Sequence, residues 1–183
     1  PVGLEQAHRV ADRIAPLRPA AVYTSPMERT RETAAPIART AGLRTRTAGG
    51  LIECDFGDWT GKPLSSLRRR KEWAKVQHSP SIFRFPGGES FSEMSQRMWD
   101  QLLVLVADHG GETIVAVSHA DPIKAAIAMA NDRPGMAHRP ALGRGQAGDV
   151  GDHGLRHVIL DIFGGLGLLR AADFADHADH MGV

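Results

Sequence analysis

The stretch TIVAVS (113–118) constrains the fold most strongly, because it is β-branched and apolar almost throughout. Such a run is typical of a strand buried on both faces, as in a parallel sheet covered by helices. The segment DPIKAAIAMA (121–130) follows at once and predicts a helix, with Pro122 in its first turn. A second apolar run, AAVYT (20–24), predicts another buried strand.

Two capping signals predict where further helices begin. Ser25-Pro26-Met27-Glu28 predicts a helix that is capped by Ser25 and runs to about Thr40, and Ser90 with Glu93 predicts a second capping box. Apolar residues at helical spacing mark the buried faces of a first helix and of the helix behind Ser90: Leu4, Ala7, Val10, Ala11, Ile14, Leu17, Met94, Met98, Leu102 and Leu105.

The segments between these elements have weaker signals. Residues 51–61 predict a loop, residues 63–77 a polar, basic helix, and residues 86–88 a turn. Helices and strands thus alternate along the chain. This order predicts an α/β protein with three layers, in which helices cover both faces of a mostly parallel sheet.

Composition excludes several classes of protein. The 183 residues hold 22 basic and 21 acidic side chains, a balance that argues against a protein that coats nucleic acid or binds an anionic membrane. No stretch approaches the roughly 20 apolar residues that span a bilayer. The opening PVGLEQAHRV does not resemble a signal peptide, and the single cysteine, Cys54, excludes an internal disulfide. We expect a cytoplasmic protein without nucleic-acid or membrane partners.

The C-terminal part differs in composition. Residues 131–183 hold 10 of the 20 glycines and 5 of the 9 histidines. The run 133–154 has neither helical nor strand periodicity and predicts loop or disorder. We therefore predict a domain over residues 1–132 and a divergent Gly/His-rich tail over residues 133–183, which is either the product of a frameshift or a genuine extension.

Two predicted strand ends carry side chains that suit an anion. Ligands of open α/β sheets bind beyond the carboxyl ends of the strands. Arg29 and Arg31 follow the first strand, and His119 follows the second. A guanidinium grips two phosphate oxygens, a helix N-terminus favours an anion, and an imidazole can donate to a phosphoryl oxygen. Simpler interpretations stay open, namely surface arginines that pair with Glu28 and Glu32, and a structural histidine.

Glu53 is a further candidate, either as a placed acid or as part of a solvated acidic loop. Other phosphate chemistries are excluded, because the chain has no GxxxxGK[ST] motif, and Thr60 stands where a cysteine phosphatase built on Cys54 needs an arginine. The two histidines of HADH (177–180) lack further placed ligands, so we predict no metal site.

Five motifs, in matching order, resemble the histidine phosphatase superfamily, which is also called phosphoglycerate-mutase-like. They are GLEQAHRVADRI (3–14), YTSPMERTRETA (23–34), LIECDFGDWTG (51–61), FPGGESFSEMSQR (85–97) and VAVSHADPIK (115–124). The resemblance covers about residues 1–132 and implies the three-layer fold of that family. The third and fifth motifs are most similar to a phosphomutase branch.

The resemblance also implies roles. Arg29 binds the transferring phosphoryl group, His119 is the second, non-nucleophilic histidine of the phosphate pocket, and Glu53 is the general acid that protonates the leaving alkoxide. The implied reaction is phosphoryl transfer through phosphohistidine, by a phosphatase or phosphomutase, on a small phosphorylated metabolite and without a cofactor or metal. Four further residues match family positions as supporting candidates: Arg31, Glu89, Ser90 and Arg97.

The sequence departs from the family at its defining motif, L-x-R-H-G-x-T, whose histidine is the nucleophile. These residues contain no R-H-G, since Arg156-His157 is followed by Val158. We expect that the central strand with this motif, roughly 20–30 residues, is missing and leaves open edges on its neighbours. Two hypotheses follow. Either the parent protein is a phosphohistidine enzyme and this chain is inactive, or the chain is a non-catalytic phosphate-ester-binding remnant or a gene fragment.

Overall fold

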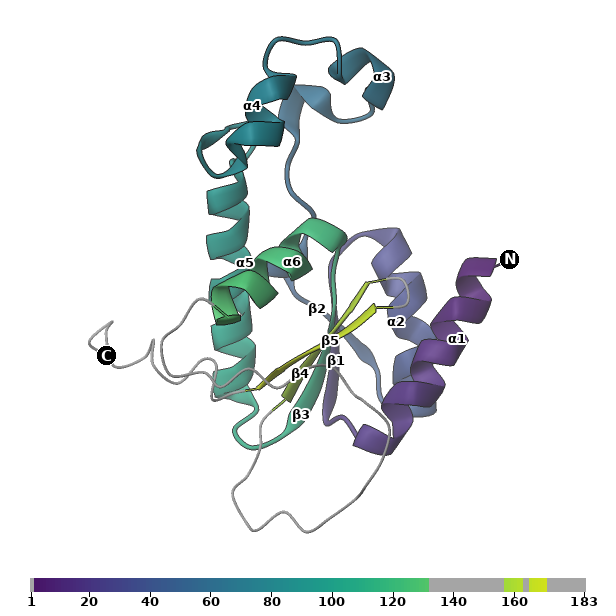
Figure 1. Ribbon diagram of the computed structural model, residues 1–183. Helices are drawn as coiled ribbons and strands as arrows, with labels where there is room; N and C mark the ends of the chain where they lie inside the picture. Colours follow the sequence, from purple (N-terminus) through teal and green to yellow (C-terminus); the bar gives the residue numbers. More distant parts are fainter. Residues whose placement is uncertain (1, 132–156, 163–164, 171–183) are drawn as a thin grey trace, which may run out of the picture.

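The described residues form one sheet in the order β2-β1-β3-β4-β5 (Figure 1). The computed structural model describes residues 2–131, 157–162 and 165–170. Strands β1 to β4 run parallel, and β5 runs antiparallel to β4, so the prediction of a mostly parallel sheet is confirmed. The strands are β1 (Ala21–Thr24), β2 (Thr45–Thr47), β3 (Thr113–Val117), β4 (His157–Ile162) and β5 (Gly165–Arg170).

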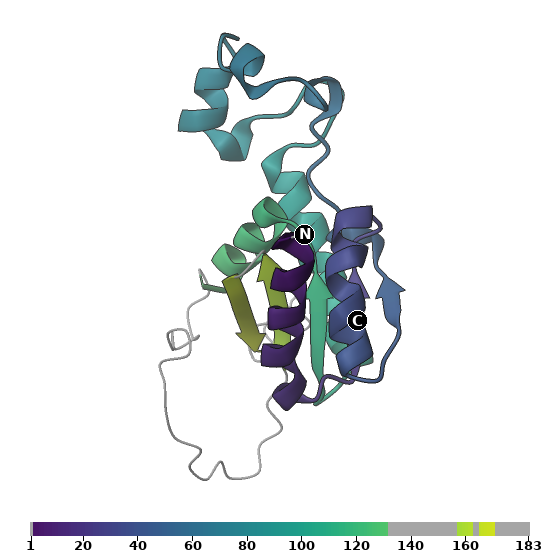
Figure 2. The same ribbon diagram turned by 90° about the vertical axis from the view of Figure 1, so that its right-hand side faces the viewer.

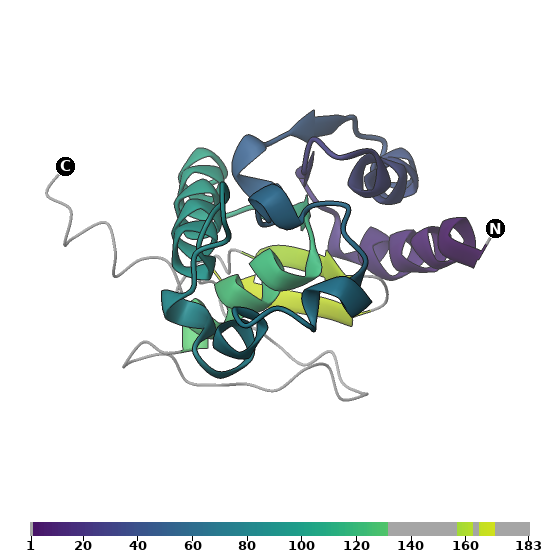
Figure 3. The same ribbon diagram turned by 90° about the horizontal axis from the view of Figure 1, so that it is seen from above.

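Four helices cover the two faces of this sheet: α1 (Val2–Ile14), α2 (Glu28–Thr40), α5 (Phe91–Asp108) and α6 (Ala120–Asn131). Figure 2 shows α1 and α2 in front of the strands, and Figure 3 shows α5 and α1 on opposite sides of them. None of the described helices is long and apolar enough to cross a membrane.

Alternating side chains of β1 and β3 pack against the helices on the two faces of the sheet. Val22 and Val115 pack in one core cluster with Ile14 of α1 and Ile37 of α2. Their neighbours point the other way and pack against α5 and α6, in a cluster that includes Ala21, Tyr23, Ile114, Ala116, Met98, Leu102 and Ile123. Because successive residues of a strand face opposite sides, both faces need apolar residues, and this explains the continuous apolar runs in the sequence.

A lobe with its own small core stands beyond one end of the sheet (Figure 1). It contains α3 (Leu64–Leu67) and α4 (Trp73–His78) in place of the single polar helix that we predicted over residues 63–77. The basic run 68–71 between them is exposed and supplies no apolar face that could hold a longer helix. The lobe is held instead by aromatic packing of Trp59 with Trp73, Phe83 and Phe85.

The two predicted helix caps have different outcomes. Ser90 and Glu93 form the predicted capping box at the start of α5. The predicted cap at Ser25 is wrong, because α2 begins at Glu28 with Met27 as its N-cap and without a side-chain cap. Ser25 Oγ accepts only a long hydrogen bond from the Met27 amide, at 3.4 Å, and lies 2.8 Å from Nε2 of His119 at the neighbouring strand end.

Strand β4 lies within the predicted tail and changes one expectation. It pairs with β3 from Thr113↔His157 to Val117↔Asp161. We expect open edges on the neighbours of a missing strand; β3 has no such edge among the described residues, because it pairs with β1 on one side and β4 on the other. Strand β5 extends the sheet further, whereas the run 133–154, predicted as loop or disorder, lies outside the described residues. The domain boundary after residue 132 stays a prediction.

Candidate active site

The candidate site lies where β1 and β3 end side by side. Since the two strands are parallel, their carboxyl ends meet at the same edge of the sheet, and the Ser25 amide donates to the Val117 carbonyl at 2.9 Å. Ser118, directly after β3, donates from Oγ to the Leu51 carbonyl at 2.7 Å. That bond brings the loop after Leu51, which carries Glu53, to the strand ends.

Three predicted residues from separate segments meet at this edge. Arg29 Nη2 lies 3.0 Å from His119 Nδ1 and 4.0 Å from Glu53 Oε2. The same Glu53 oxygen lies 3.8 Å from His119 Nδ1. The side chain of Arg29 is 46% exposed and that of His119 only 3%. The structure thus combines a cation that solvent-borne ligands can reach with a buried imidazole and a carboxyl group.

The surroundings of His119 favour its neutral form. Burial, which is the largest effect, and the positive charges of Arg29 and Arg97 together lower the pKa of the ring from 6.5 to about 4. The ring of the ligand-free site is therefore uncharged at neutral pH.

The pKa of Glu53 is shifted in the opposite direction, upward. Burial raises the pKa of its carboxyl group, and the negative charge of Asp121 adds to this effect. The Cys54 amide, which donates to Oε1 at 3.0 Å, and the charges of Arg29 and Arg97 oppose it. Since the net direction is upward, Glu53 keeps its proton to a higher pH than an exposed glutamate does.

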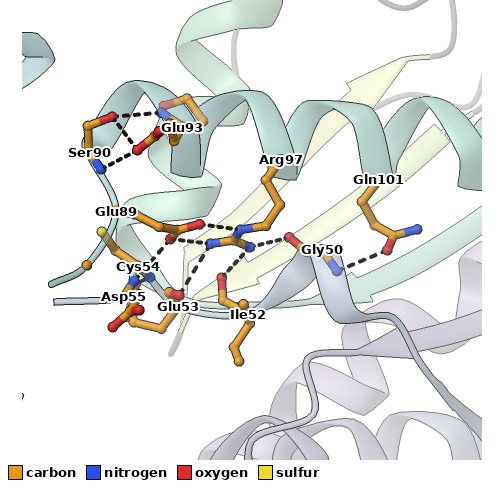
Figure 4. Close-up of polar contacts among 12 residues, drawn as sticks. Gly50, Ile52, Glu53, Cys54, Asp55, Glu89, Ser90, Glu93, Arg97 and Gln101 are labelled. Carbon is orange, nitrogen blue, oxygen red and sulfur yellow. Dashed lines mark hydrogen bonds and ion pairs between the residues drawn. The ribbon is translucent and has the colours of Figure 1, made fainter. Parts of the chain in front are cut away.

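Arg97 of α5 holds the loop that carries Glu53 (Figure 4). Its guanidinium binds both carboxylate oxygens of Glu89, at 2.8 and 2.9 Å. It also donates to the carbonyls of Gly50, Ile52 and Glu53 at 2.7, 3.1 and 3.3 Å. The hydrogen bond from Arg97 is the main reason that the pKa of Glu89 is lowered. The Arg97–Glu89 pair therefore holds the loop that carries Glu53 in place.

The remaining predicted residues lie outside the cluster. Ser90 caps α5, and Arg31 is exposed on α2, where its side chain has no hydrogen bond or ion pair with described residues. Sequence reasoning missed Ser25 as a partner of His119 and Asp121 as a charge that acts on Glu53. The pair Asp121-Pro122 at the start of α6 indicates a helix start. The sequence signal that could have revealed the role of Asp121 is its position two residues after His119.

A groove of about 510 Å³ lies apart from the Arg29–His119 pair, between α5 and α6. Its lining includes Phe91, Met94 and Met129, and of the charged groups near the site only Asp121 contributes to it. The described residues contain no cluster of three or more His, Cys, Asp or Glu side chains that could hold a metal ion.

A match to a protein-family model shows to which known proteins the chain is related. The model described as the histidine phosphatase superfamily, branch 1, matches residues 1–146. The chain belongs to this superfamily. The resemblance drawn from the five motifs is thereby confirmed at the level of the family, whereas its phosphomutase branch stays a prediction.

Curated proteins with similar sequences include a phosphatase and a probable mutase. The Mycobacterium tuberculosis protein "Bifunctional protein Rv2228c" is 32% identical over 114 residues, which are 62% of this chain and 31% of that protein. "Phosphoserine phosphatase 1" of Hydrogenobacter thermophilus is 29% identical over 67% of this chain and 59% of its own length. "Probable phosphoglycerate mutase GpmB" of Yersinia pestis is 30% identical over 75% of this chain and 65% of its length. The chain thus spans about a third of the first relative and less than two thirds of the others.

Solved structures of the superfamily share the fold. The mycobacterial glucosyl-3-phosphoglycerate phosphatase Rv2419c matches with a TM-score of 0.66 and 24% identity, over 73% of this chain and 67% of that one. A phosphoserine phosphatase mutant of Entamoeba histolytica, solved in complex with phosphoserine, matches with a TM-score of 0.61 and 29% identity, over 69% and 64% of the two chains. The α/β sheet with helices on both faces is therefore the histidine phosphatase fold.

Proposed function

We propose that this chain binds the phosphoryl group of a small phosphate ester at the Arg29–His119 pair, with Glu53 as the acid beside the leaving group. One observation carries the proposal: three side chains that are far apart in sequence meet within 4.0 Å at one edge of the sheet. Phosphoryl transfer needs donors around the phosphoryl oxygens and an acid for a poor leaving group. Arg29, His119 and Glu53 are groups of these kinds.

The electrostatics support the acid role of Glu53. Its pKa is already raised by burial and by Asp121, and a phosphate dianion nearby raises it further, because two negative charges repel. The carboxyl group then holds a proton that it can give to an alkoxide. Arg29 contributes the exposed end of the site, where a phosphoryl group from solvent can enter.

For the parent protein we infer phosphoryl transfer through phosphohistidine, by a phosphatase or a phosphomutase. Relatives of both kinds support this class, and one solved relative carries phosphoserine, a small phosphorylated metabolite. For residues 1–183 alone we infer binding without turnover, since these residues contain no R-H-G motif. Loss of a positioned nucleophile removes most of the rate enhancement in enzymes that use one. This function is a phosphate-ester-binding role rather than catalysis.

Isothermal titration of the chain with phosphate and with vanadate tests the binding site. We expect a Kd below about 1 mM. Arg29→Met should weaken binding at least about tenfold, because it removes a charge-assisted contact. Arg39→Met, on the exposed last turn of the same helix, is the matched control and should leave the Kd unchanged. A chain that folds but binds neither anion contradicts the proposal.

A phosphorylated donor tests the absence of turnover. After incubation, mass spectrometry should find no acid-labile adduct of about 80 Da, the mass of one phosphoryl group. An adduct on His119 or His8, together with product formation above background, contradicts this part of the proposal. In a longer form that carries the nucleophile, Glu53→Gln should slow alkyl phosphates much more than aryl phosphates, because aryl leaving groups need less protonation. Equal losses would remove Glu53 from the acid role.

A further inference from the structure

Ser25 is fully buried beside His119, and the hydrogen bonds around the ring determine where its proton lies. Arg29 Nη2 lies 3.0 Å from His119 Nδ1. A guanidinium has only donors, so Nδ1 accepts this bond and carries no proton. The proton of the neutral ring therefore lies on Nε2, which donates to Ser25 Oγ at 2.8 Å.

The unprotonated Nδ1 is the ring nitrogen that faces the other site groups. Glu53 Oε2 lies 3.8 Å from it, and Arg29 is in hydrogen-bond contact with it. A phosphoryl oxygen that binds Arg29 at this point meets a lone pair of the ring rather than a donor. Because an anionic oxygen and a nitrogen lone pair repel each other, close contact requires a proton on Nδ1.

We propose that Ser25 is a positioning residue that keeps the His119 proton on Nε2, and that an anion therefore enters the site together with one proton, which binds Nδ1. The proposal rests on the function proposed above, since it concerns the same pair. The proton comes from solvent and forms a bond with the Nδ1 lone pair, and no bond of the anion breaks. Arg29 turns its donors from the ring to the anion, while Nε2–H remains bonded to Ser25.

The charges around the ring allow this change only when the anion is present. Arg29 from α2 and Arg97 from α5 are the cations that act on His119, and with burial they keep the free ring neutral. Glu53 faces the ring from its loop, and Asp121 on α6 acts on Glu53. A bound tetrahedral dianion brings two negative charges to Nδ1 and outweighs the single charge of Arg29. The field at the ring then favours the imidazolium form.

Calorimetry with sulfate tests the proton uptake. Sulfate stays a dianion near neutral pH, so any proton taken up belongs to the protein. We expect the binding enthalpy at pH 7 to rise linearly with the ionisation enthalpy of the buffer, with a slope of at least about one proton per anion. Because the anion also raises the pKa of Glu53, its carboxyl group can add to this uptake; Glu53→Gln removes that contribution and should show a slope of about one, which assigns this proton to His119. Sulfate binding by Glu53→Gln with a slope of zero overturns the inference but leaves the proposed function standing. Failure of both sulfate and phosphate to bind overturns the proposed function itself.

Nitrogen-15 NMR of the histidine rings tests the role of Ser25 directly. In the free chain, His119 should show the Nε2–H tautomer, and with sulfate both nitrogens should carry protons. Ser25→Ala removes the acceptor of Nε2–H, so the tautomers should mix and the proton uptake should fall well below one. Ser25→Thr retains the hydroxyl group and should restore both readouts. An Nδ1–H tautomer in the free wild-type chain overturns the inference, whether or not the variants fold.

Discussion

Arg97→Met is expected to destabilise the fold by about 3 kcal/mol. The Arg97 guanidinium donates two hydrogen bonds to Glu89 and three to the carbonyls of Gly50, Ile52 and Glu53. Removing one partner of a buried ion pair costs about 3–5 kcal/mol, because the other charge stays desolvated and unpaired. The side chains of Arg97 and Glu89 are 25% and 23% exposed, so water reaches both and the lower end of this range applies.

Urea unfolding followed by circular dichroism measures the effect. Arg84→Met is the matched control, because Arg84 also pairs with a glutamate, Glu93, but the two side chains are 59% and 48% exposed. A surface pair of this kind contributes less than about 1 kcal/mol. A double-mutant cycle of Arg97→Met with Glu89→Gln should give a coupling free energy above about 1 kcal/mol. If Arg97→Met costs no more than Arg84→Met, the guanidinium does not hold the Glu53 loop in the way described.

Three further predictions concern pH, the core and the loop turn. The pKa of His119 is lowered from 6.5 to about 4, so its neutral ring contributes stability that is complete above pH 6.5 and is lost as the pH falls toward 4. This loss is at most about 3 kcal/mol. Urea unfolding at pH 7 and pH 4.5 should show the difference in the free energy of unfolding, and His119→Asn should reduce it. Met98→Ala should lower the free energy of unfolding by about 2–5 kcal/mol, because Met98 is fully buried. Val104→Ala, at an exposed position of the same helix, should lower it by less than about 0.5 kcal/mol. Equal losses would place Met98 outside the core. Gly57→Ala should lower the melting temperature more than Gly61→Ala. Both glycines have positive φ, but only at Gly57 would a Cβ lie 2.2 Å from the Pro86 carbonyl oxygen. Similar melting temperatures of the two variants would show that this contact is not tight.

Features that depend on neighbouring residues were predictable from the sequence. The capping box of Ser90 and Glu93 needs only residues three apart, and the structure contains it. The buried strand 113–117 and the helix after it were also predictable, because apolar runs and helix starts are local patterns. The motif order predicted the family, and the structure brings Arg29, Glu53 and His119 together at one edge of the sheet.

Features that depend on distant partners were not predictable. Ser25 has the local pattern of a helix cap, yet its side chain binds His119, which lies 94 residues away in sequence. The pairing of β3 with β4 is of the same kind, because HVILDI (157–162) is an apolar, β-branched run that favours a strand but carries no signal of which strand it pairs with. For Ser25, the local cap is worth only about 1 kcal/mol, so a contact with a distant residue can readily outweigh it.

The sequence by itself therefore determined the α/β class, the family and the residue types that suit a phosphoryl group. Only the tertiary structure decided how these residues act on one another: that Arg97 anchors the Glu53 loop, that Asp121 raises the pKa of Glu53, and that Nε2 of His119 lies against Ser25 Oγ. The physical reason is range. Backbone preferences and caps act over a few residues, whereas desolvation, charge and hydrogen-bond direction depend on which groups the fold brings within a few ångströms.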